Sequence, residues 1–325
     1  MSLETEAVLD RRRLRRSMSF WRAAAVLGVA ITLGAIGLLV AGDDKPNGGL
    51  FDRRQIARVS IEGMITENRD QLKLLRRIAQ NDRVAAVILF VNSPGGTTTG
   101  GEALFEAIRE ISAKKPVVAQ FGTIATSAAY IAGLATDQII ARGNTITGSV
   151  GVIFQWAEVS ELLAKIGVKM NEVKSGPLKA EPSPFHPLGP AGRETTERMV
   201  AESMGWFRGL VADRRKVDTG AVPGLEQGRI FSGREALEHK LIDGIGGERE
   251  VLRYLVDKKG IGRDLKVVDW KPKDDNRLGV LGMLGRTVGA AFGLGDLVER
   301  WVDPDAGLLA LRASGLVSIW QPSER

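Results

Sequence analysis

Ser127 stands where an apolar run gives way to small residues, in the stretch IATSAAYIAG at residues 124–133. A serine there can cap a helix, because its hydroxyl accepts a hydrogen bond from an unpaired N–H group of the first turn. It can also serve as a nucleophile, since the partial positive charge of a helix N-terminus stabilises an anion that develops beside it. This stretch by itself leaves both interpretations open.

A serine nucleophile needs a base, and the chain offers few histidines. Its only two are His186, in a proline-rich loop, and His239, which lies between charged neighbours on an expected helix. Lysine is the other candidate, provided that burial among apolar groups removes its proton. Lys179, in VKSGPLKAEPSPF, follows an expected strand and a Gly-Pro turn. The ordinary interpretation of such a residue is a solvated loop lysine, so the residues alone do not identify the base.

A glycine-rich loop, NSPGGTTTGGEA at residues 92–103, follows an apolar run at 84–91. Pro94 favours a turn, and Gly95 and Gly96 allow backbone angles and close approaches that other residues do not. Because it leaves the carboxyl end of an expected parallel strand, the loop lies where α/β proteins place binding sites. Its bare N–H groups are suited to an oxyanion, whereas the lysine of a phosphate-binding GxxxxGK(S/T) loop is missing.

The elements that must position these residues alternate along the chain. Short runs rich in β-branched residues predict buried strands, and apolar residues at spacings of three and four predict amphipathic helices. The expected strands span residues 56–65, 84–92, 116–122, 137–142 and 168–176, and the expected helices span 68–82, 101–112, 127–135, 157–166 and a long stretch around 200–211. This alternation predicts βαβ units and a mostly parallel sheet within one α/β domain.

Composition excludes several classes of protein. The formal net charge is +6, but six arginines and three acidic residues within the first 22 residues account for +3 of it. The remaining charge of about +3 is too diffuse to predict a nucleic-acid partner. The absence of cysteine excludes disulfides, a thiol nucleophile and thiolate metal sites, and two histidines argue against multi-histidine metal ligation. We therefore expect no metal and no cofactor.

Residues 23–41, AAAVLGVAITLGAIGLLVA, predict a membrane anchor. Nineteen uncharged residues in a helix span about 28 Å, close to the thickness of one hydrocarbon core. The arginines before them predict that the N-terminus is cytoplasmic and that the rest of the chain lies across the membrane. A cleaved signal peptide is the alternative, although its apolar region is usually only about 7–15 residues long.

Taken together, these segments resemble the signal peptide peptidase A family in its short, single-domain form, a membrane-anchored serine protease with a Ser/Lys dyad. The resemblance runs in order from Ile56 to Gly247, through VSIEGMI, FVNSPGG, TSAAYIAGLATDQIIARGNTITGSVGVI, VKSGPLKAEPSPF and GRIFSGREALEHKLIDGIGG. It implies a Clp-protease/crotonase-like spiral of ββα units after one N-terminal transmembrane helix.

Two positions depart from the pattern of many members. Ala128 follows the serine where many have glycine, but alanine keeps the N–H group that an oxyanion hole needs. Glu181, close to Lys179, could form an ion pair that keeps the lysine charged. We expect its carboxylate to point elsewhere, because Pro182 restricts the backbone of Glu181 to extended angles.

The resemblance also implies the site and its chemistry. The implied residues are Ser127 as nucleophile, Lys179 as general base, Gly95, Gly96 and Ala128 around the oxyanion, and Ser149 either as a residue that orients the lysine or as a turn hydroxyl. The implied reaction is cleavage of remnant signal peptides or other short apolar peptides outside the cytoplasmic membrane. The implied assembly is a homo-oligomeric ring in which the serine of one subunit meets the lysine of the next.

The expected organisation has five parts. They are a cytoplasmic basic tail at 1–22, the anchor at 23–41, a tether at 42–54, a peptidase domain at 55–264 and an extension at 265–325. The extension contains a glycine-rich apolar stretch, residues 278–297, that could pack on a neighbouring subunit, lie on the membrane or form a second span. A non-catalytic scaffold of the same fold in a membrane complex is the alternative function, and a crotonase-like acyl-CoA enzyme is a further one.

Overall fold

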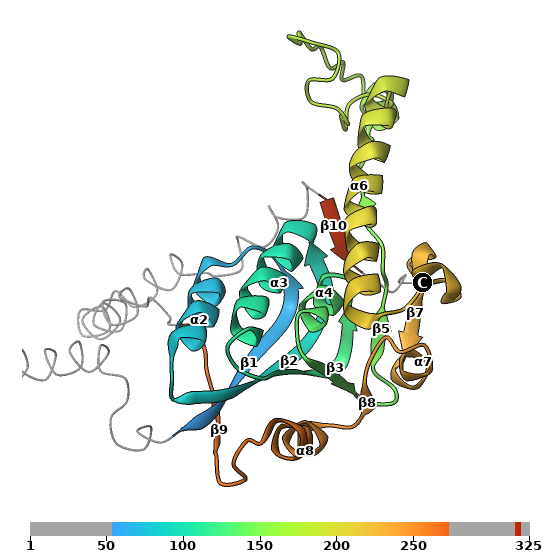
Figure 1. Cartoon of the computed structure of the whole chain (residues 1–325). Helices are drawn as coiled ribbons and strands as arrows, with labels where there is room; N and C mark the ends of the chain where they lie inside the picture. Colours follow the sequence, from blue (N-terminus) through green and yellow to red (C-terminus); the bar gives the residue numbers. More distant parts are fainter. Residues whose placement is uncertain (1–53, 273–315, 320–325) are drawn as a thin grey trace, which may run out of the picture. The chain divides into compact units, whose positions relative to one another are not determined.

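The computed structural model describes residues 54–272 and 316–319 (Figure 1). The expected basic tail and anchor, nearly all of the tether, and the apolar stretch 278–297 lie outside the described residues. Within the described ranges, none of the helices has both the length and the apolar character that crossing a membrane requires.

The described residues form ten strands, seven α-helices and two short 3-10 helices. In order they are β1 (Gln55–Ile65), α2 (Arg69–Gln80), β2 (Val84–Thr97), α3 (Thr98–Ser112), β3 (Val117–Thr126), α4 (Ala128–Leu134), β4 (Gln138–Ala141), β5 (Ile146–Gly148), β6 (Ile153–Phe154), α5 (Ser160–Lys165), α6 (Pro190–Arg215), the 3-10 helices η1 (Thr219–Ala221) and η2 (Leu225–Gln227), β7 (Ile230–Ser232), α7 (Gly233–Glu238), β8 (Gly244–Ile245), α8 (Glu248–Lys259), β9 (Val267–Asp269) and β10 (Leu316–Ile319).

A parallel sheet forms the centre of the fold. β1 pairs with β2, β2 with β3, β3 with β4, and β4 with β8, all in parallel. Helices α2, α3 and α4 lie on one face and α8 on the other (Figure 1). Successive residues of β2 therefore enter opposite cores: Val87 packs with the helices of the first face, and Ile88 packs against α8. Burial on both faces explains why this strand is a continuous apolar run.

The predicted mixed α/β fold is confirmed, and one predicted strand is wrong. The expected strands at 56–65, 84–92, 116–122 and 137–142 correspond to β1, β2, β3 and β4. Residues 168–176 form no strand, because most of them are exposed and no neighbouring strand pairs with them in the described part of the chain. The helix expected at 157–166 is reduced to α5. The long helix begins at Pro190, where the fixed φ of proline suits the first helical position.

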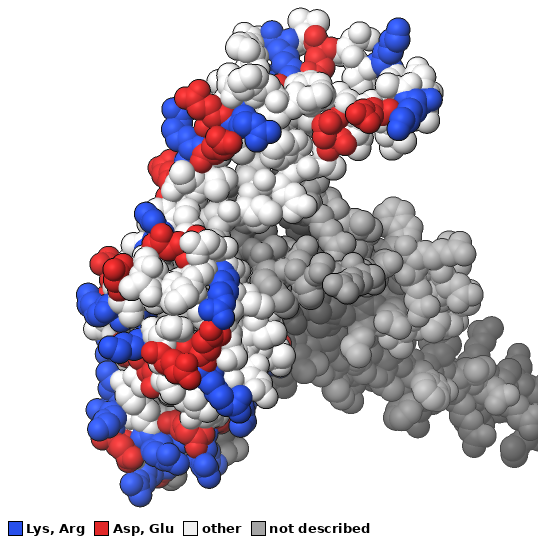
Figure 2. All heavy atoms as spheres, turned by 90° about the vertical axis from the view of Figure 1, so that its right-hand side faces the viewer, with Lys and Arg blue, Asp and Glu red and all other residues white. Residues whose placement is uncertain are grey.

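Residues 157–189, called the arm below, project at the N-terminal end of α6 (Figure 1). Its helix α5 has no buried residue. Charged side chains gather on the arm and on the lower body, and the surface between them is largely uncharged (Figure 2). The exposed large apolar side chains of the arm are Leu162, Ile166, Val168, Met170, Val173, Leu178 and Phe185. So many apolar side chains on one projecting segment are typical of a surface that another molecule covers.

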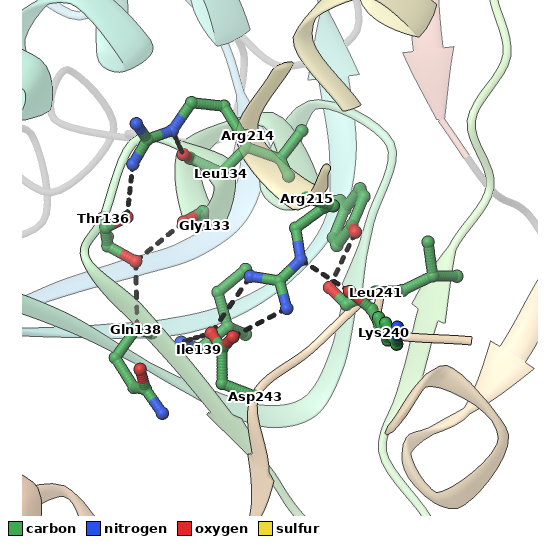
Figure 3. A network of polar contacts seen from close by, with 11 residues as sticks. Gly133, Leu134, Thr136, Gln138, Ile139, Arg214, Arg215, Lys240, Leu241 and Asp243 are labelled. Atoms are coloured by element: carbon green, nitrogen blue, oxygen red, sulfur yellow. Dashed lines mark hydrogen bonds and ion pairs between the residues drawn. The ribbon is translucent and has the colours of Figure 1, made fainter. Parts of the chain in front are cut away.

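A network of hydrogen bonds holds α4 against α6 and against the segment around Leu241 (Figure 3). The buried hydroxyl of Tyr130 donates to the carbonyl of Leu241 at 2.7 Å. Arg214, near the end of α6, donates to the carbonyls of Leu134 and Thr136 at 2.7 and 2.9 Å. The carbonyl of Leu134, the last residue of α4, has no partner within the helix, and that of Thr136 lies just after the helix, so these bonds satisfy both.

The next residue of α6 ties the same region to the sheet. Arg215 donates to both carboxylate oxygens of Asp243 at 3.0 and 2.8 Å (Figure 3). Asp243 in turn accepts a hydrogen bond from the N–H of Ile139 in β4 at 2.7 Å. A bidentate pair of this kind holds its partners in one geometry. The network therefore connects α6, α4 and β4 into a rigid support.

We predict that Tyr130→Phe destabilises the fold by about 1–2 kcal/mol, because the carbonyl of Leu241 loses a buried donor. Burial of the Tyr130 hydroxyl also raises its pKa, so it remains a donor at neutral pH. Equilibrium denaturant unfolding measures the change. Tyr254→Phe, at the chain's other tyrosine, is the matched control and is expected to cost less than about 0.5 kcal/mol. Equal losses in the two variants would contradict the assignment.

Candidate active site

Ser127 occupies a strained turn between β3 and α4. Its φ and ψ are 59° and −121°, and its side chain makes no capping hydrogen bond to the helix. The residue is 1% exposed, and within the described residues its Oγ has no hydrogen-bond partner. The capping interpretation therefore lacks the bond on which it depends. A buried hydroxyl without a partner, on a backbone that non-glycine residues seldom adopt, is typical of a functional position.

The small residues after Ser127 let α4 pack deep inside the protein. Every residue of α4 is buried. A Cβ atom added at Gly101 of α3 would lie 3.2 Å from the Cβ of Ala128, and one added at Gly133 would lie 2.4 Å from the ring of Phe121. The composition of IATSAAYIAG thus follows from close packing against α3 and β3. This packing places the first turn of α4 beside the end of the sheet.

The glycine loop lies beside this turn because it forms the end of β2. Gly95 has a φ of 110°, and a Cβ added at Gly96 would lie 1.8 Å from the carbonyl oxygen of Ile65, so only glycine fits there. The buried hydroxyl of Ser93 accepts a hydrogen bond from the N–H of Gly95 at 3.1 Å. Thr126, directly before Ser127, donates to the carbonyl of Pro94 at 2.9 Å. The serine and the loop are therefore tied together by residues of both segments.

The two remaining candidates, Ala128 and Ser149, also belong to this cluster. Ala128 is the first residue of α4, and the N–H groups of a first helical turn have no acceptor within the helix. The N–H of Ser127 donates to the carbonyl of Gly148 at 2.9 Å, which places Ser149 next along the adjoining segment. Ser149 is 8% exposed with a φ of 52°. The fold thus brings Gly95, Gly96, Ser127, Ala128 and Ser149 to one end of the sheet.

Lys179 is not part of this cluster in the single chain. It lies in the arm, where it is exposed. Because the Oγ of Ser127 has no partner among the described residues, no hydrogen bond joins the two side chains within one subunit. Glu181 pairs with Lys174 instead, at 3.1 Å. Within the described residues, the Glu181 carboxylate is therefore engaged by Lys174 and not by Lys179.

The cluster around Lys174 is the principal polar contact of the arm. Lys174 also contacts Glu172 at 2.8 Å and the Nε2 atom of His186 at 3.0 Å. The hydrogen bond from Lys174 lowers the pKa of Glu172, and the same bond raises the pKa of Lys174. His186 is thereby engaged within the arm, and His239 packs edge-on against Phe231, with ring centroids 5.8 Å apart. Neither histidine bonds to Ser127.

The residues that support the site were not among those expected from the sequence. The hydroxyls of Ser93 and Thr126 join the loop to the serine, and both stand in quoted motifs, where the tendency of such hydroxyls to bond nearby backbone gave a usable signal. No such signal marks Arg215 and Asp243, because these two residues meet only after the chain has folded. The same holds for β10, whose partners precede it by more than 160 residues.

The turn at Ser127 leads to a prediction about stability. Ser127→Gly and Ser127→Ala both remove the unpaired hydroxyl, but only glycine adopts a positive φ without strain. We expect the glycine variant to be more stable than the alanine variant by about 1–2 kcal/mol in denaturant unfolding. At Ser112, at the end of α3, the same pair of substitutions should give the opposite order, because glycine is unfavourable in helices. The same order at both positions would rule out strain at Ser127.

The sequence of this chain is similar to those of known peptidases. The model of "Peptidase family S49" matches residues 109–262, and the model of "Clp protease" matches residues 49–143. A relative from Synechocystis sp., named "Putative protease", is 32% identical over 219 residues, which are 67% of this chain and 79% of the relative. Another from Enterococcus faecium, named "Putative signal peptide peptidase SppA", is 30% identical over 283 residues, 82% of this chain and 77% of the relative.

Among solved structures, a mutant of the 1510-N membrane-bound stomatin-specific protease in complex with a substrate peptide is 16% identical, with a TM-score of 0.45 over 71% of this chain and 98% of that one. The sequence relatives identify the family. The chain belongs to peptidase family S49, the family of signal peptide peptidase A, and it is a peptidase.

Proposed function

We propose that the chain is a serine endopeptidase in which Ser127 is the nucleophile and Lys179 of a neighbouring copy is the general base. The observation that carries the proposal is the state of the Ser127 hydroxyl, which is buried and has no partner among the described residues. A hydroxyl in that state leaves its proton open to a base that the described residues of the single chain do not supply. The exposed position of Lys179 on the arm suits delivery to another subunit.

In the proposed reaction, the neutral amine of Lys179 takes the proton of Ser127 as the Oγ atom attacks the peptide carbonyl. The N–H groups of Gly96 and Ala128 hold the resulting oxyanion, each contributing about 3–4 kcal/mol to the transition state. The protonated lysine then gives its proton to the leaving amine, and an acyl-enzyme remains. Water activated by the same lysine hydrolyses the ester. Ser149 orients the lysine in this scheme.

Assembly supplies the environment that a lysine base requires. A lysine acts as a base when burial removes the water that stabilises its charged form. The apolar side chains of the arm, Leu178 among them, are suited to cover a neighbouring subunit and to exclude water around Lys179. A homo-oligomeric ring meets this need, because each arm then serves the next serine. The Clp-protease/crotonase-like spiral of ββα units is the fold proposed for each subunit.

The proposed substrates are remnant signal peptides or other short apolar peptides. An apolar cavity of about 440 Å³ supports this choice, since it lies beside β6 and is lined mostly by apolar groups, including Val152, Phe154, Trp156 and Met204. The uncharged stretch 23–41 and the arginines before it support an anchor in the cytoplasmic membrane, with the catalytic domain on its outer side. Such a placement brings the site close to peptides that leave the bilayer.

We predict that Ser127→Ala and Lys179→Ala each lower kcat for peptide hydrolysis at least about a thousandfold and leave the unfolding midpoint nearly unchanged. A fluorophosphonate probe should label the detergent-solubilised wild type and should not label Ser127→Ala. Lys169→Ala removes another exposed lysine of the arm and serves as the matched control, with activity close to that of the wild type. Activity in Lys179→Ala comparable to the wild type would refute the lysine base and return attention to His186.

A mixing experiment tests the shared site. Inactive Ser127→Ala and inactive Lys179→Ala subunits, dissociated and reassembled together, should regain up to about a quarter of the wild-type activity, because some interfaces then join an intact Ser127 to an intact Lys179. Each variant reassembled alone is the control. If mixed assemblies verified by mass are no more active than either parent, the dyad lies within one chain.

A further inference from the structure

A hydroxyl that is bonded to the glycine loop lies directly before the candidate nucleophile. Thr126 is fully buried, and its Oγ1 atom donates to the carbonyl of Pro94 at 2.9 Å. The two residues are 32 positions apart in the chain, so this bond forms only when β2 and β3 lie side by side. It links the two segments that carry the proposed chemistry, the loop at the end of β2 and the turn at Ser127.

The bond lies where the backbone pairing of β2 and β3 ends. The pairing shifts register just before Ser93 and Ala125, which are the last pair in the described ladder between these strands. The next residue of β2 is Pro94, and proline has no N–H group to donate to a neighbouring strand. Beyond the last pair, the hydroxyl of Thr126 therefore takes the place of a ladder bond.

Two hydroxyls hold the peptide unit between Pro94 and Gly95. Its carbonyl accepts the bond from Thr126, and its N–H donates to the Oγ atom of Ser93 at 3.1 Å. The carbonyl and the N–H of a trans peptide unit point in opposite directions, so the two bonds act from opposite sides. Both side chains are fully buried. The rotation of this unit is therefore fixed by side chains from two strands.

The glycines of the loop need such a restraint. Gly95 has a φ of 110°, and without a Cβ atom the peptide units on either side of it can rotate with little steric resistance. The following unit carries the N–H of Gly96, the proposed oxyanion donor. The carbonyl of that unit accepts a second, longer bond from the Oγ atom of Ser93, at 3.4 Å. The direction of the Gly96 N–H thus depends on peptide units that the hydroxyls hold.

We propose that Thr126 is a positioning residue, which fixes the Pro94–Gly95 peptide and thereby directs the N–H of Gly96 at the carbonyl that Ser127 attacks. The inference rests on the proposed function, because it orients the oxyanion donor named there. Thr126 itself touches neither the substrate nor the oxyanion in this role. An oxyanion exists only in the transition state, so a misdirected donor lowers kcat and leaves substrate binding unchanged.

The kinetic test uses the full chain with Thr126→Val, which removes the hydroxyl and keeps the β-branched shape. With a short fluorogenic apolar peptide, kcat should fall about 10–100-fold and KM should stay within about twofold of the wild type. Thr126→Ser restores a hydroxyl and should bring kcat back to within about threefold of the wild type. A kcat in Thr126→Val within about threefold of the wild type would overturn the proposal.

Thr147→Val is the matched control. Thr147, in β5, is fully buried, and its Oγ1 atom donates to the carbonyl of Ala125 at 2.8 Å. The substitution removes the same kind of bond to the same strand, but that bond does not involve the glycine loop. Thr147→Val should lose as much stability in denaturant unfolding as Thr126→Val and keep kcat within about threefold of the wild type. Equal losses of kcat in the two variants would contradict a specific positioning role.

Hydrogen exchange separates the inference from the proposed chemistry, because it needs no hydrolysis. Measured by mass spectrometry on the full chain, the amides of residues 93–97 should exchange at least about fivefold faster in Thr126→Val than in the wild type. Thr147→Val should leave their exchange rate unchanged. Unchanged exchange in Thr126→Val would overturn the positioning role. A failure of the catalytic proposal would be recognised separately, by a Ser127→Ala variant that still hydrolyses peptides.

Discussion

The N–H group of Ser127 donates to the carbonyl of Gly148 at 2.9 Å, where β3 gives way to α4. This bond joins the end of β3 to the end of β5 and holds Ser127 at a φ of 59°. A serine in such a conformation costs about 1–3 kcal/mol, so the turn persists only because its surroundings fix it. Tyr130 bonds to Leu241, and Arg215 bonds to Asp243, which together hold the helix that follows. The arrangement of the candidate site depends on this turn.

The end of β2 beside the candidate site is covered by another strand of the same chain. A strand edge that is left open attracts unwanted strands. The end of β2 cannot be protected by large side chains, because Gly96 lies against the carbonyl of Ile65. The pairing of β10 with Gly95–Thr97 covers this edge by backbone contacts alone. A strand of the same chain therefore protects this edge from unwanted pairing.

The division between body and arm is the structural basis of the proposed assembly. The body buries its apolar side chains around the sheet in two cores. The arm instead exposes apolar side chains such as Val173 and Ile166 to water. Its principal polar contact is a small group of charges around Lys174. A segment with so little apolar burial of its own gains most of its order from what it contacts. In the proposed ring, that contact and the completed site form together.

Local signals in the sequence determined much of the fold. The apolar runs predicted β1 to β4, and the spacing of Leu104, Ile108 and Ile111 predicted α3, because strand and helix periods are properties of neighbouring residues. The glycines of the loop and the serine before α4 were found for the same reason, and the order of the motifs predicted the family. The strand expected at 168–176 failed because β-branched residues form a strand only where another strand pairs with them.

The tertiary structure decided the contacts between residues that are distant in sequence. It paired Glu181 with Lys174 rather than Lys179, joined Arg215 to Asp243, and left the hydroxyl of Ser127 buried without a partner among the described residues. It also placed β10 against β2. Each of these contacts depends on which segments meet once the cores have formed, and no local pattern records that choice. The sequence alone therefore identified the residues that carry the proposed chemistry, whereas the folded chain decided their surroundings.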